Sequence, residues 1–517
     1  MPLTRLDVAV CFLALLITRW ISGRRQRHSS LPLPPGPRGL PIIGNLRDVP
    51  TKHSWLTFQQ WRYKYDSDLV RFNLLGSEFV VVNSLKVAID LFDRRSRIYN
   101  DRSNYVFSVD LCGMGWLITF IPYGNFWKDT RRAFHRGLGT DAVKDYIDVE
   151  VSAARNLLVR LHKSPEHFME HLRHMAGRII MRSAYGIKVQ DDDDPYVDIA
   201  ERGIQALNEG MNAGSFLVDS IPILRYIPEW FPGAHFKRFA KELRIPVTGM
   251  LEKPYGYFKK QMESGADLPQ CAASTLHENM MSKAEDPEYT ESFIKASLAS
   301  MYTGGADTTV STLGTFVLAM VLNPEVQAKA HAELDRVIGT GRLPEVSDKP
   351  SLPYVDAIVR ETLRWHPVVP VNVPHRLIQD DEYEGYFLPE GTSLIVNIWG
   401  ILHDPEAYPD PMAFKPDRFL KDGVIDPSVQ DPMLACFGFG RRICPGRWLA
   451  KESVWITIST LLAAYRFDNA IGPDGRKIVP EEVYSSGVIS YPQSFKCEIR
   501  PRSAECEALI LAIANEK

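Results

Sequence analysis

One cysteine of this sequence lies in a glycine-rich loop beside two arginines. The loop spans residues 437–446 and reads FGFGRRICPG, with the cysteine at 444, and a helix-like stretch from Arg447 to Ala464 follows it. Glycines let backbone N–H groups approach a ligand closely, and the start of a helix carries a positive partial charge that lowers the pKa of a nearby thiol. A thiolate held in this way can bind heme iron as an axial ligand. On this loop alone, a buried and unreactive cysteine in a turn remains the alternative.

A second polar segment interrupts the long apolar stretch from Phe293 to Leu322, which reads as a core helix. This segment, residues 304–309, reads GGADTT. Two interior glycines cost a helix roughly 2 kcal/mol relative to alanine, and a threonine can bend a helix by bonding a carbonyl one turn back. Because the stretch from Val310 to Val321 contains no proline and no glycine except Gly314, the pattern favours a distorted helix over one that ends here.

Charged and aromatic side chains recur at helical spacing elsewhere. Glu361 and Arg364 share a face of a helix that we expect to open at Ser351 and Pro353. An apolar stripe on the same helix indicates that this pair is buried, although a surface ion pair is the usual meaning of such spacing. A further arginine, Arg418, lies in the later segment FKPDRF at 414–419.

Trp127 and Arg131 lie four residues apart in a helix-like run from Phe126 to Leu138 and therefore share a face. An indole N–H and a guanidinium together suit a carboxylate. His375 stands in the segment VPHR at 373–376. A lone histidine is more often a bystander than a ligand.

Together these segments resemble the cytochrome P450 superfamily of heme-thiolate monooxygenases. The fixed positions of its heme-binding signature are all met, at Phe437, Gly438, Gly440, Arg442, Cys444 and Gly446. The resemblance implies heme b (iron protoporphyrin IX) with the Cys444 thiolate as its axial ligand. It also implies cofactor contacts, to the heme propionates above all, from Trp127, Arg131, His375, Arg442, Gly438 and Gly446.

The resemblance assigns roles to the remaining segments too. Asp307 and Thr308 match the oxygen-activation motif and would relay protons for cleavage of the O–O bond. Gly304 stands where the family more often has alanine. Glu361, Arg364 and Arg418 match a structural charge cluster behind the heme, so we expect them to serve folding and heme retention, and not the chemistry.

The expected fold is mainly α with small β-sheets (α+β). Short β-rich runs occur at 69–74 and 79–83, mixed short strands return near 376–398, and the middle of the chain reads mostly as helix. We divide the chain into a transmembrane anchor at 1–23, a basic, proline-rich hinge at 24–45 and a single heme-binding monooxygenase domain at 46–517.

The N-terminus is apolar from Leu6 to Ile21. Sixteen helical residues span about 24 Å, somewhat less than a hydrocarbon core of roughly 30 Å. Three arginines follow at 24, 25 and 27, whereas only Arg5 precedes the run, so the positive-inside rule places the catalytic domain in the cytosol. We predict a retained single-pass anchor in the endoplasmic reticulum membrane, with a cleaved signal peptide as the rival interpretation.

The composition and charge of the chain limit the classes of partner that we expect it to bind. The 517 residues are 45% hydrophobic and 24% charged, which is ordinary for a globular protein, and a net charge of −3 argues against nucleic-acid binding. Seven scattered cysteines without CxxC spacing argue against a disulfide framework or structural zinc. Electrons would come from NADPH through a separate NADPH-cytochrome P450 reductase. It would be attracted by a basic face that we place at Lys128, Arg132, Arg441, Arg447 and Lys451.

The predicted activity is insertion of one oxygen atom of O2 into a small lipophilic substrate. We expect substrate contacts from Val106–Phe120, Met301–Thr303, Val368–Val373 and Ser486–Ile489. The apolar stretch 215–235 would be either core or a cap over the substrate entrance that dips into the membrane. The sequence resembles fungal microsomal members that tailor secondary metabolites such as terpenoids, polyketides and indoles. A heme-thiolate isomerase or dehydratase and a non-catalytic heme sensor are the alternatives; the isomerase is disfavoured because Thr308 is present.

Overall fold

The computed structural model describes residues 30–103, 105–210 and 216–515. The predicted anchor at 1–23 lies outside these residues. The described part of the hinge runs along the first strand of the main sheet, where the Arg71 N–H donates to Pro35 O at 2.8 Å. A side chain at Gly36 would approach Arg71 O to 1.9 Å, so the close passage at this point requires glycine.

The described chain is mainly helical, as predicted, and the α-helices have the following bounds. In the first half they are α2 (Ser54–Tyr65), α3 (Leu85–Ala88), α4 (Asn125–Leu138), α5 (Ile147–Lys163), α6 (Phe168–Tyr185), α7 (Pro195–Gly210), α8 (Leu217–Ser220) and α9 (His235–Glu263). In the second half they are α10 (Ala272–Met280), α11 (Pro287–Leu322), α12 (Pro324–Val337), α13 (Pro353–Trp365), α14 (Ile398–Leu402), α15 (Met433–Cys436), α16 (Arg447–Ala464) and α17 (Ala504–Asn515).

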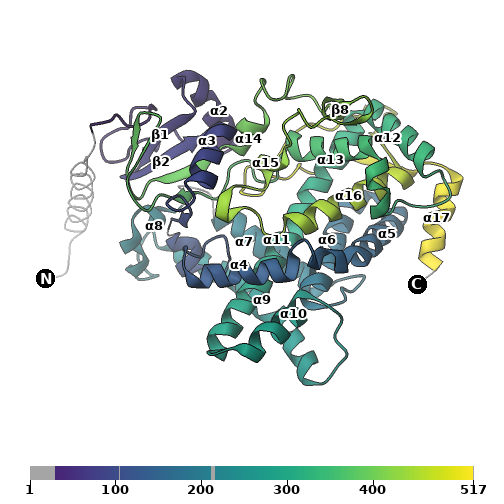
Figure 1. Cartoon of the computed structure of the whole chain (residues 1–517), viewed down its shortest axis with the longest axis horizontal. Helices are drawn as coiled ribbons and strands as arrows, with labels where there is room; N and C mark the ends of the chain where they lie inside the picture. Colours follow the sequence, from purple (N-terminus) through teal and green to yellow (C-terminus); the bar gives the residue numbers. More distant parts are fainter. Residues whose placement is uncertain (1–29, 104, 211–215, 516–517) are drawn as a thin grey trace.

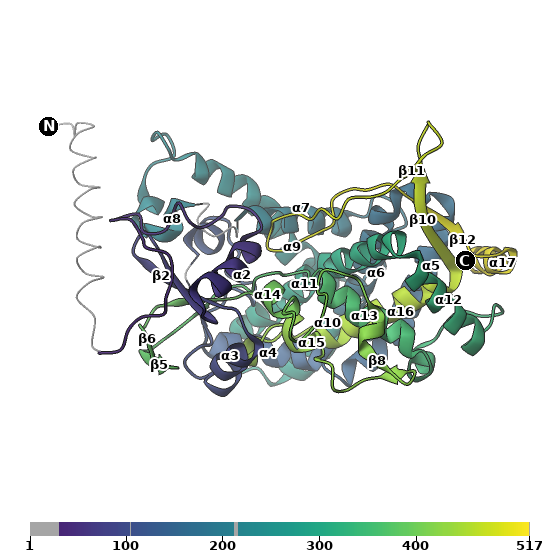
Figure 2. The same ribbon diagram turned by 90° about the horizontal axis from the view of Figure 1, so that it is seen from above.

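The strands of the described residues form four small sheets, of which the two largest lie at opposite ends of the molecule. The five-stranded sheet has the order β1-β2-β7-β4-β3, in which β2 and β7 are parallel. Figures 1 and 2 place β1 and β2 at one end of the long axis, and α17 at the other end beside the β11-β10-β12 sheet. The strands are β1 (Leu69–Leu74), β2 (Ser77–Val82), β3 (Asp101–Arg102), β4 (His375–Arg376), β5 (Asp381–Tyr383), β6 (Tyr386–Leu388), β7 (Ser393–Val396), β8 (Leu420–Lys421), β9 (Val424–Ile425), β10 (Tyr465–Ile471), β11 (Lys477–Ile478) and β12 (Cys497–Pro501).

Helix α11 is the central element of the helical part. It runs without a break for 36 residues, which confirms that the GGADTT segment does not end it. It packs against α4, α6, α7 and α9 on its way through the molecule. Among the described helices, α11 alone is long and apolar enough to cross a membrane, but 78% of its most apolar stretch is buried within the protein. Its apolar character is therefore that of a core helix.

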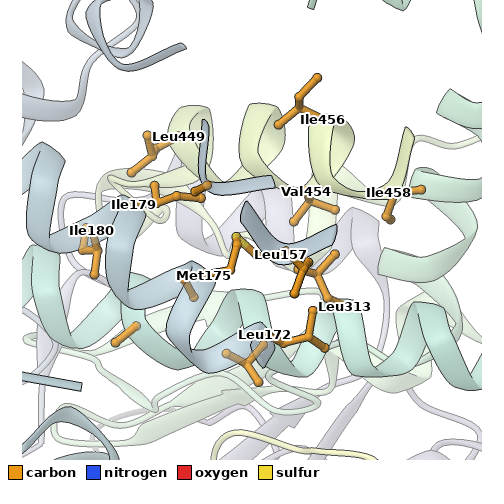
Figure 3. Close-up of a cluster of buried hydrophobic side chains, with 14 of the residues drawn as sticks. Leu157, Leu172, Met175, Ile179, Ile180, Leu313, Leu449, Val454, Ile456 and Ile458 are labelled. Carbon is orange, nitrogen blue, oxygen red and sulfur yellow. The ribbon is translucent and has the colours of Figure 1, made fainter. Parts of the chain in front are cut away.

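The largest apolar core lies where α5, α6, α11 and α16 meet. Figure 3 shows Leu157 of α5, Met175 of α6, Leu313 of α11 and Val454 of α16 converging there. Each of these side chains is almost fully buried. This packing fixes α11 relative to α16, the two helices that carry the polar segments singled out in the sequence.

The apolar stretch 215–235 is largely exposed where it is described. Leu217, Ile223, Tyr226 and Trp230 are 53%, 54%, 71% and 79% exposed, and Val218 alone of the large apolar side chains in α8 is buried. A core position for the whole stretch, one of the two interpretations of its sequence, is therefore wrong.

Candidate active site

A cavity of about 360 Å³ lies between α11 and the glycine-rich loop that precedes α16. It brings together residues predicted from segments far apart in the sequence. The predicted site residues that line it are Trp127, Arg131, Thr308, His375, Gly438, Arg442, Cys444 and Gly446. Asp307 does not line it.

The loop that carries Cys444 is held in one conformation by its own backbone. The Cys444 N–H donates to Phe437 O at 2.8 Å, which closes the loop on itself. Gly438 and Gly440 have φ of 76° and 57°, a region that favours glycine. A side chain at Gly440 would also lie 1.9 Å from Phe92 O. Two of the predicted glycines thus act through backbone conformation and close packing.

The pKa of the Cys444 thiol is shifted in the direction opposite to the one predicted from the sequence. Burial raises the pKa of Cys444, while the N–H groups of Gly446 and Arg447 and the charge of Arg131 lower it. We predicted that the helix start would lower this pKa. In the structure the start of α16 offsets only part of the cost of burial, because the sulfur lies inside the cavity and away from bulk water.

Two of the predicted propionate ligands, Arg131 and Arg442, form a half-buried cationic group in the same cavity as the sulfur. Arg131 Nη1 donates to Ile443 O at 2.6 Å, and Arg442 Nε donates to Asn100 O at 2.8 Å. The Arg442 guanidinium also lies over the Trp127 ring, 4.6 Å from its centroid. Burial lowers the pKa of Arg131 to about 10 and, together with the charge of Arg102, that of Arg442 to about 8.

Arg102 of β3 is a member of this group that sequence reasoning missed. It is 9% exposed and donates from Nη1 to Val373 O at 2.6 Å and from Nε to Thr119 O at 2.9 Å. Burial lowers its pKa to about 10. Arg102 lies in a two-residue strand and forms no periodic pattern with other charged or aromatic residues, so the sequence alone did not identify it.

These residues fit a bound heme. The Trp127 Nε1 and Arg442 Nη2 atoms are buried and have no hydrogen-bond partner within the described ranges. Buried donors of this kind are costly unless a ligand satisfies them, and carboxylates such as heme propionates would do so. The cavity also presents the Cys444 sulfur, a suitable iron ligand.

His375 lies in the cavity wall with its ring fixed. Its Nδ1 is 2.7 Å from Tyr99 O, a carbonyl that can only accept, so Nδ1 carries the proton. Burial lowers the pKa of His375 well below its usual value. Its Nε2 is therefore an acceptor, and it becomes a donor to a carboxylate only when the ring takes a second proton.

The two residues predicted for proton transfer point to different spaces. Thr308 lines the cavity, and its Oγ1 donates to Gly304 O at 2.7 Å. Asp307 faces a small space between α6, α7 and α11, where the Tyr491 hydroxyl donates to its carboxylate. Burial raises the pKa of Asp307 to about 6. The structure therefore places these neighbours on different sides of α11.

The adjacent glycines of α11 have different surroundings. A Cβ on Gly304 would meet no atom within 4 Å, because this residue faces the cavity. A Cβ on Gly305 would lie 2.8 Å from two atoms of Ile180 in α6. Gly305 is thus required for helix packing, whereas Gly304 leaves open space above the cavity.

This difference predicts that alanine at the two positions has opposite effects on the stability of the protein. Gly304→Ala is expected to stabilise the protein by about 1 kcal/mol, since alanine is the better helix former. Gly305→Ala is expected to destabilise it by about 1–3 kcal/mol, because Ile180 must move. The melting temperatures of the two variants check this, and equal shifts of one sign would contradict it.

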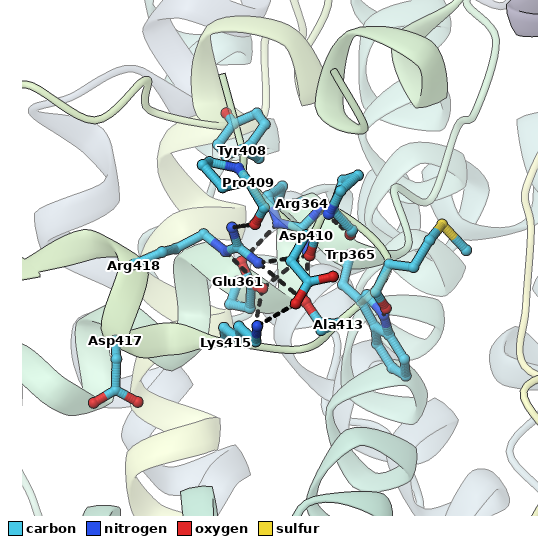
Figure 4. Close-up of polar contacts among 12 residues, drawn as sticks. Glu361, Arg364, Trp365, Tyr408, Pro409, Asp410, Ala413, Lys415, Asp417 and Arg418 are labelled. Atoms are coloured by element: carbon cyan, nitrogen blue, oxygen red, sulfur yellow. Dashed lines mark hydrogen bonds and ion pairs between the residues drawn. The ribbon is translucent and has the colours of Figure 1, made fainter. Parts of the chain in front are cut away.

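The predicted charge cluster is assembled away from the cavity (Figure 4). Arg364 donates from Nε and Nη2 to the two oxygens of Glu361 at 2.7 and 2.8 Å, and Arg418 Nε donates to Glu361 Oε1 at 3.1 Å. Glu361 and Arg364 are fully buried. Helix α13 begins at Pro353, and Glu333 of α12 accepts hydrogen bonds from the N–H groups of Tyr354 and Val355 in its first turn.

Comparison with known proteins gives the family. The model of the cytochrome P450 family matches residues 34–496. A cytochrome P450 monooxygenase of Armillaria gallica is 40% identical over 507 residues, 98% of either chain, and one of Coprinopsis cinerea is 38% identical over 502 residues, 96% of either chain. Tryptamine 4-monooxygenase of Psilocybe cyanescens is 37% identical over 490 residues, 94% of this chain and 96% of its own. The chain belongs to the cytochrome P450 family.

Within that family the chain is a monooxygenase, which confirms the predicted enzyme class. Enzymes of this kind use O2, a lipophilic substrate and a redox partner, and the family implies a heme-thiolate cofactor. The relatives named above are fungal proteins, in line with the resemblance stated from the sequence.

Proposed function

We propose that this protein hydroxylates, or oxidises in a related way, a lipophilic intermediate of secondary metabolism such as a terpenoid or a polyketide. The observation that carries the proposal is one cavity lined by the Cys444 thiol, by the guanidinium groups of three arginines and by Thr308 of α11. One enclosed space is thus lined by three kinds of group. They are a thiol that can bind a metal, donors that suit an anionic cofactor, and a hydroxyl of a core helix.

In the proposed mechanism, the Cys444 thiolate would hold heme b, which would supply oxidation of a C–H bond by O2. Arg131, Arg442 and the Trp127 indole would hold its propionates. The Thr308 hydroxyl holds a proton at Oγ1 next to the cavity. The Asp307 carboxyl takes up and releases protons on the other side of α11, where it faces the small space between α6, α7 and α11. With its pKa at about 6, Asp307 changes protonation state near neutral pH.

Electrons are proposed to come from NADPH-cytochrome P450 reductase. Lys128, Arg132 and Arg441 are exposed, and both the Lys128 ammonium and the Arg441 guanidinium lie over the Tyr123 ring, at 5.4 and 5.6 Å. Arg447 and Lys451 of the predicted basic face are half-buried. Exposed cations near the Cys444 loop suit an acidic partner surface and would accelerate encounter with it.

The proposed location is the endoplasmic reticulum membrane, with the catalytic domain in the cytosol. Exposed apolar side chains support it: Leu40 of the hinge, Leu46 directly after the hinge, and Tyr226 and Trp230. Figures 1 and 2 show α8, which precedes these last two residues, at the same end of the molecule as β1 and β2. An apolar surface at that end suits contact with a lipid interface.

The substrate is proposed to be neutral. One relative carries tryptamine in its name, and tryptamine is a cation at neutral pH. In this chain no aspartate or glutamate lines the cavity within the described ranges. An ammonium group without a carboxylate partner is costly to bury, so we do not extend that substrate to this protein.

The test combines a spectrum and a labelling experiment. The reduced protein under carbon monoxide is expected to show a strongly red-shifted Soret band, which reports thiolate ligation of heme. With reductase, NADPH and its substrate, it is expected to transfer one atom of isotopically labelled O2 to the product. A normal band with a product that contains no label would indicate an isomerase or dehydratase, and a normal band with no substrate-dependent NADPH consumption would indicate a heme sensor.

A further inference from the structure

Several hydroxyl groups of α11 that line the cavity already have hydrogen-bond partners within the protein. Thr303 Oγ1 donates to Ala299 O at 2.8 Å, and Thr308 Oγ1 donates to Gly304 O at 2.7 Å. The Ser300 hydroxyl accepts from the Ile118 N–H at 3.0 Å. In this structure the hydroxyl protons of Thr303 and Thr308 are thus donated to carbonyls one turn back in α11, and most neighbouring cavity side chains are apolar.

Asn372 is different. It lies between α13 and β4 and lines the same cavity. Its Oδ1 accepts from the Val396 N–H at 2.7 Å, and its own N–H donates to Val396 O at 3.2 Å. Because a backbone N–H requires an acceptor, the orientation of the amide is fixed with Oδ1 toward β7. The Nδ2 group has no hydrogen-bond acceptor among the described residues.

The backbone on either side of Asn372 is also held. Val371 forms a β-bridge with Asn397, and the carbonyls of Val373 and Pro374 accept from the buried Arg102 guanidinium. A donor on such a rigid support loses little conformational entropy when a ligand binds. This arrangement is that of an anchor group in a mostly apolar pocket.

We infer that Asn372 Nδ2 is the anchor for the substrate, and that the substrate is a neutral, largely apolar molecule with a hydrogen-bond acceptor such as a carbonyl or ether oxygen. The inference rests on the proposed function, because it takes the cavity above the Cys444 loop to be the substrate site. It goes further by naming the group that orients the ligand and the atom type that this group recognises.

The chemistry of the cavity supports an uncharged ligand. Its ionisable lining residues are arginines, a lysine, a histidine and cysteines, with no carboxylate in the described part of the chain. An ammonium ligand would have to leave water without gaining an anionic side chain. A ligand oxygen, in contrast, would satisfy the Asn372 amide without bringing an uncompensated charge into the cavity.

The test compares the affinities of three ligands built on the same rigid adamantane skeleton. Adamantane offers no acceptor, adamantanone adds a carbonyl oxygen, and trimethyladamantylammonium carries a permanent charge without a lone pair for iron. Their dissociation constants are measured on the heme-loaded protein, by calorimetry and by the shift of its Soret band. The wild type is expected to prefer adamantanone over adamantane by roughly three- to tenfold, the range for one neutral hydrogen bond.

Three variants make the test specific to the Nδ2 donor. Asn372→Leu is expected to abolish the preference for the ketone. Asn372→Asp keeps an oxygen toward Val396 and is expected to lose that preference and to bind the ammonium ligand about tenfold more tightly than the wild type does. Asn279→Leu, which removes an exposed amide of α10 that does not line the cavity, is expected to leave the ketone preference unchanged.

The outcomes separate the inference from the proposed function. An unchanged ketone preference in Asn372→Leu, with a normal carbon monoxide spectrum, would overturn the inference and leave the proposed function standing. Reduced heme retention in Asn372→Leu without a change in ketone preference would also overturn it, and would assign the amide to the cofactor. An absent red-shifted band in the wild type would instead contradict the proposed function.

Discussion

Replacing Glu361 by alanine is expected to lower the free energy of unfolding by about 3–5 kcal/mol, the range for removing one partner of a buried ion pair. The carboxylate accepts from both buried arginines, Arg364 and Arg418, and from the Lys415 N–H at 2.7 Å. Alanine would leave two cations facing each other without their anion. The remaining acceptors of Arg364, which are backbone carbonyls, carry only partial charge.

The measurement is urea-induced unfolding followed by tryptophan fluorescence, together with the heme content of the purified variant. Lys329→Ala is the matched control, because it removes an ion pair with Asp417 in which both side chains are more than half exposed. That change is expected to cost less than about 1 kcal/mol. A Glu361→Ala protein as stable as Lys329→Ala would show that the cluster does not stabilise the fold.

Much of the local structure followed from short-range patterns. The bounds of α16 match the predicted run from Arg447 to Ala464, and α4 begins one residue before the predicted Phe126. β1 matches as well, whereas β2 begins at Ser77 and not at Phe79. Periodicity and turn residues determine such elements, because each depends mainly on its own sequence.

Residues whose role depends on distant partners could not be predicted. Glu333 caps α13 from another helix, and Arg102 acquires its importance only when β3 pairs with β4. The sequence placed Asp307 and Thr308 side by side, but their directions depend on how α6 and α7 pack around α11. The same holds for the Cys444 pKa, which burial raises although local charges lower it.

The resemblance to a family predicted contacts between distant segments, which periodicity could not predict. Glu361 and Arg364 were predicted to pair from spacing alone, but Arg418 joins them from 54 positions beyond Arg364, and only the family pattern connected the segments. Asn372 lies within the segment Val368–Val373 that was expected to contact substrate, but no motif singled it out there. Its unsatisfied amide became visible only when β7 was placed beside it.

Replacing Cys444 by alanine is expected to abolish the red-shifted Soret band of the reduced, carbon monoxide-treated protein. The side chain lines the cavity and is not part of the apolar core between α6 and α16. The fold should therefore persist, as circular dichroism would show, while the iron loses its thiolate ligand and the heme dissociates more readily.

Cys436 provides the matched control for this variant. It lines the same cavity eight positions earlier in the chain, and burial raises the pKa of its thiol above the usual range. Among the described residues, no N–H donates to its sulfur from a helix start, as those of Gly446 and Arg447 do for Cys444. Cys436→Ala is accordingly expected to keep the band. Loss of the band in Cys436→Ala with its retention in Cys444→Ala would transfer the role of iron ligand to Cys436, because only a thiolate produces that spectrum.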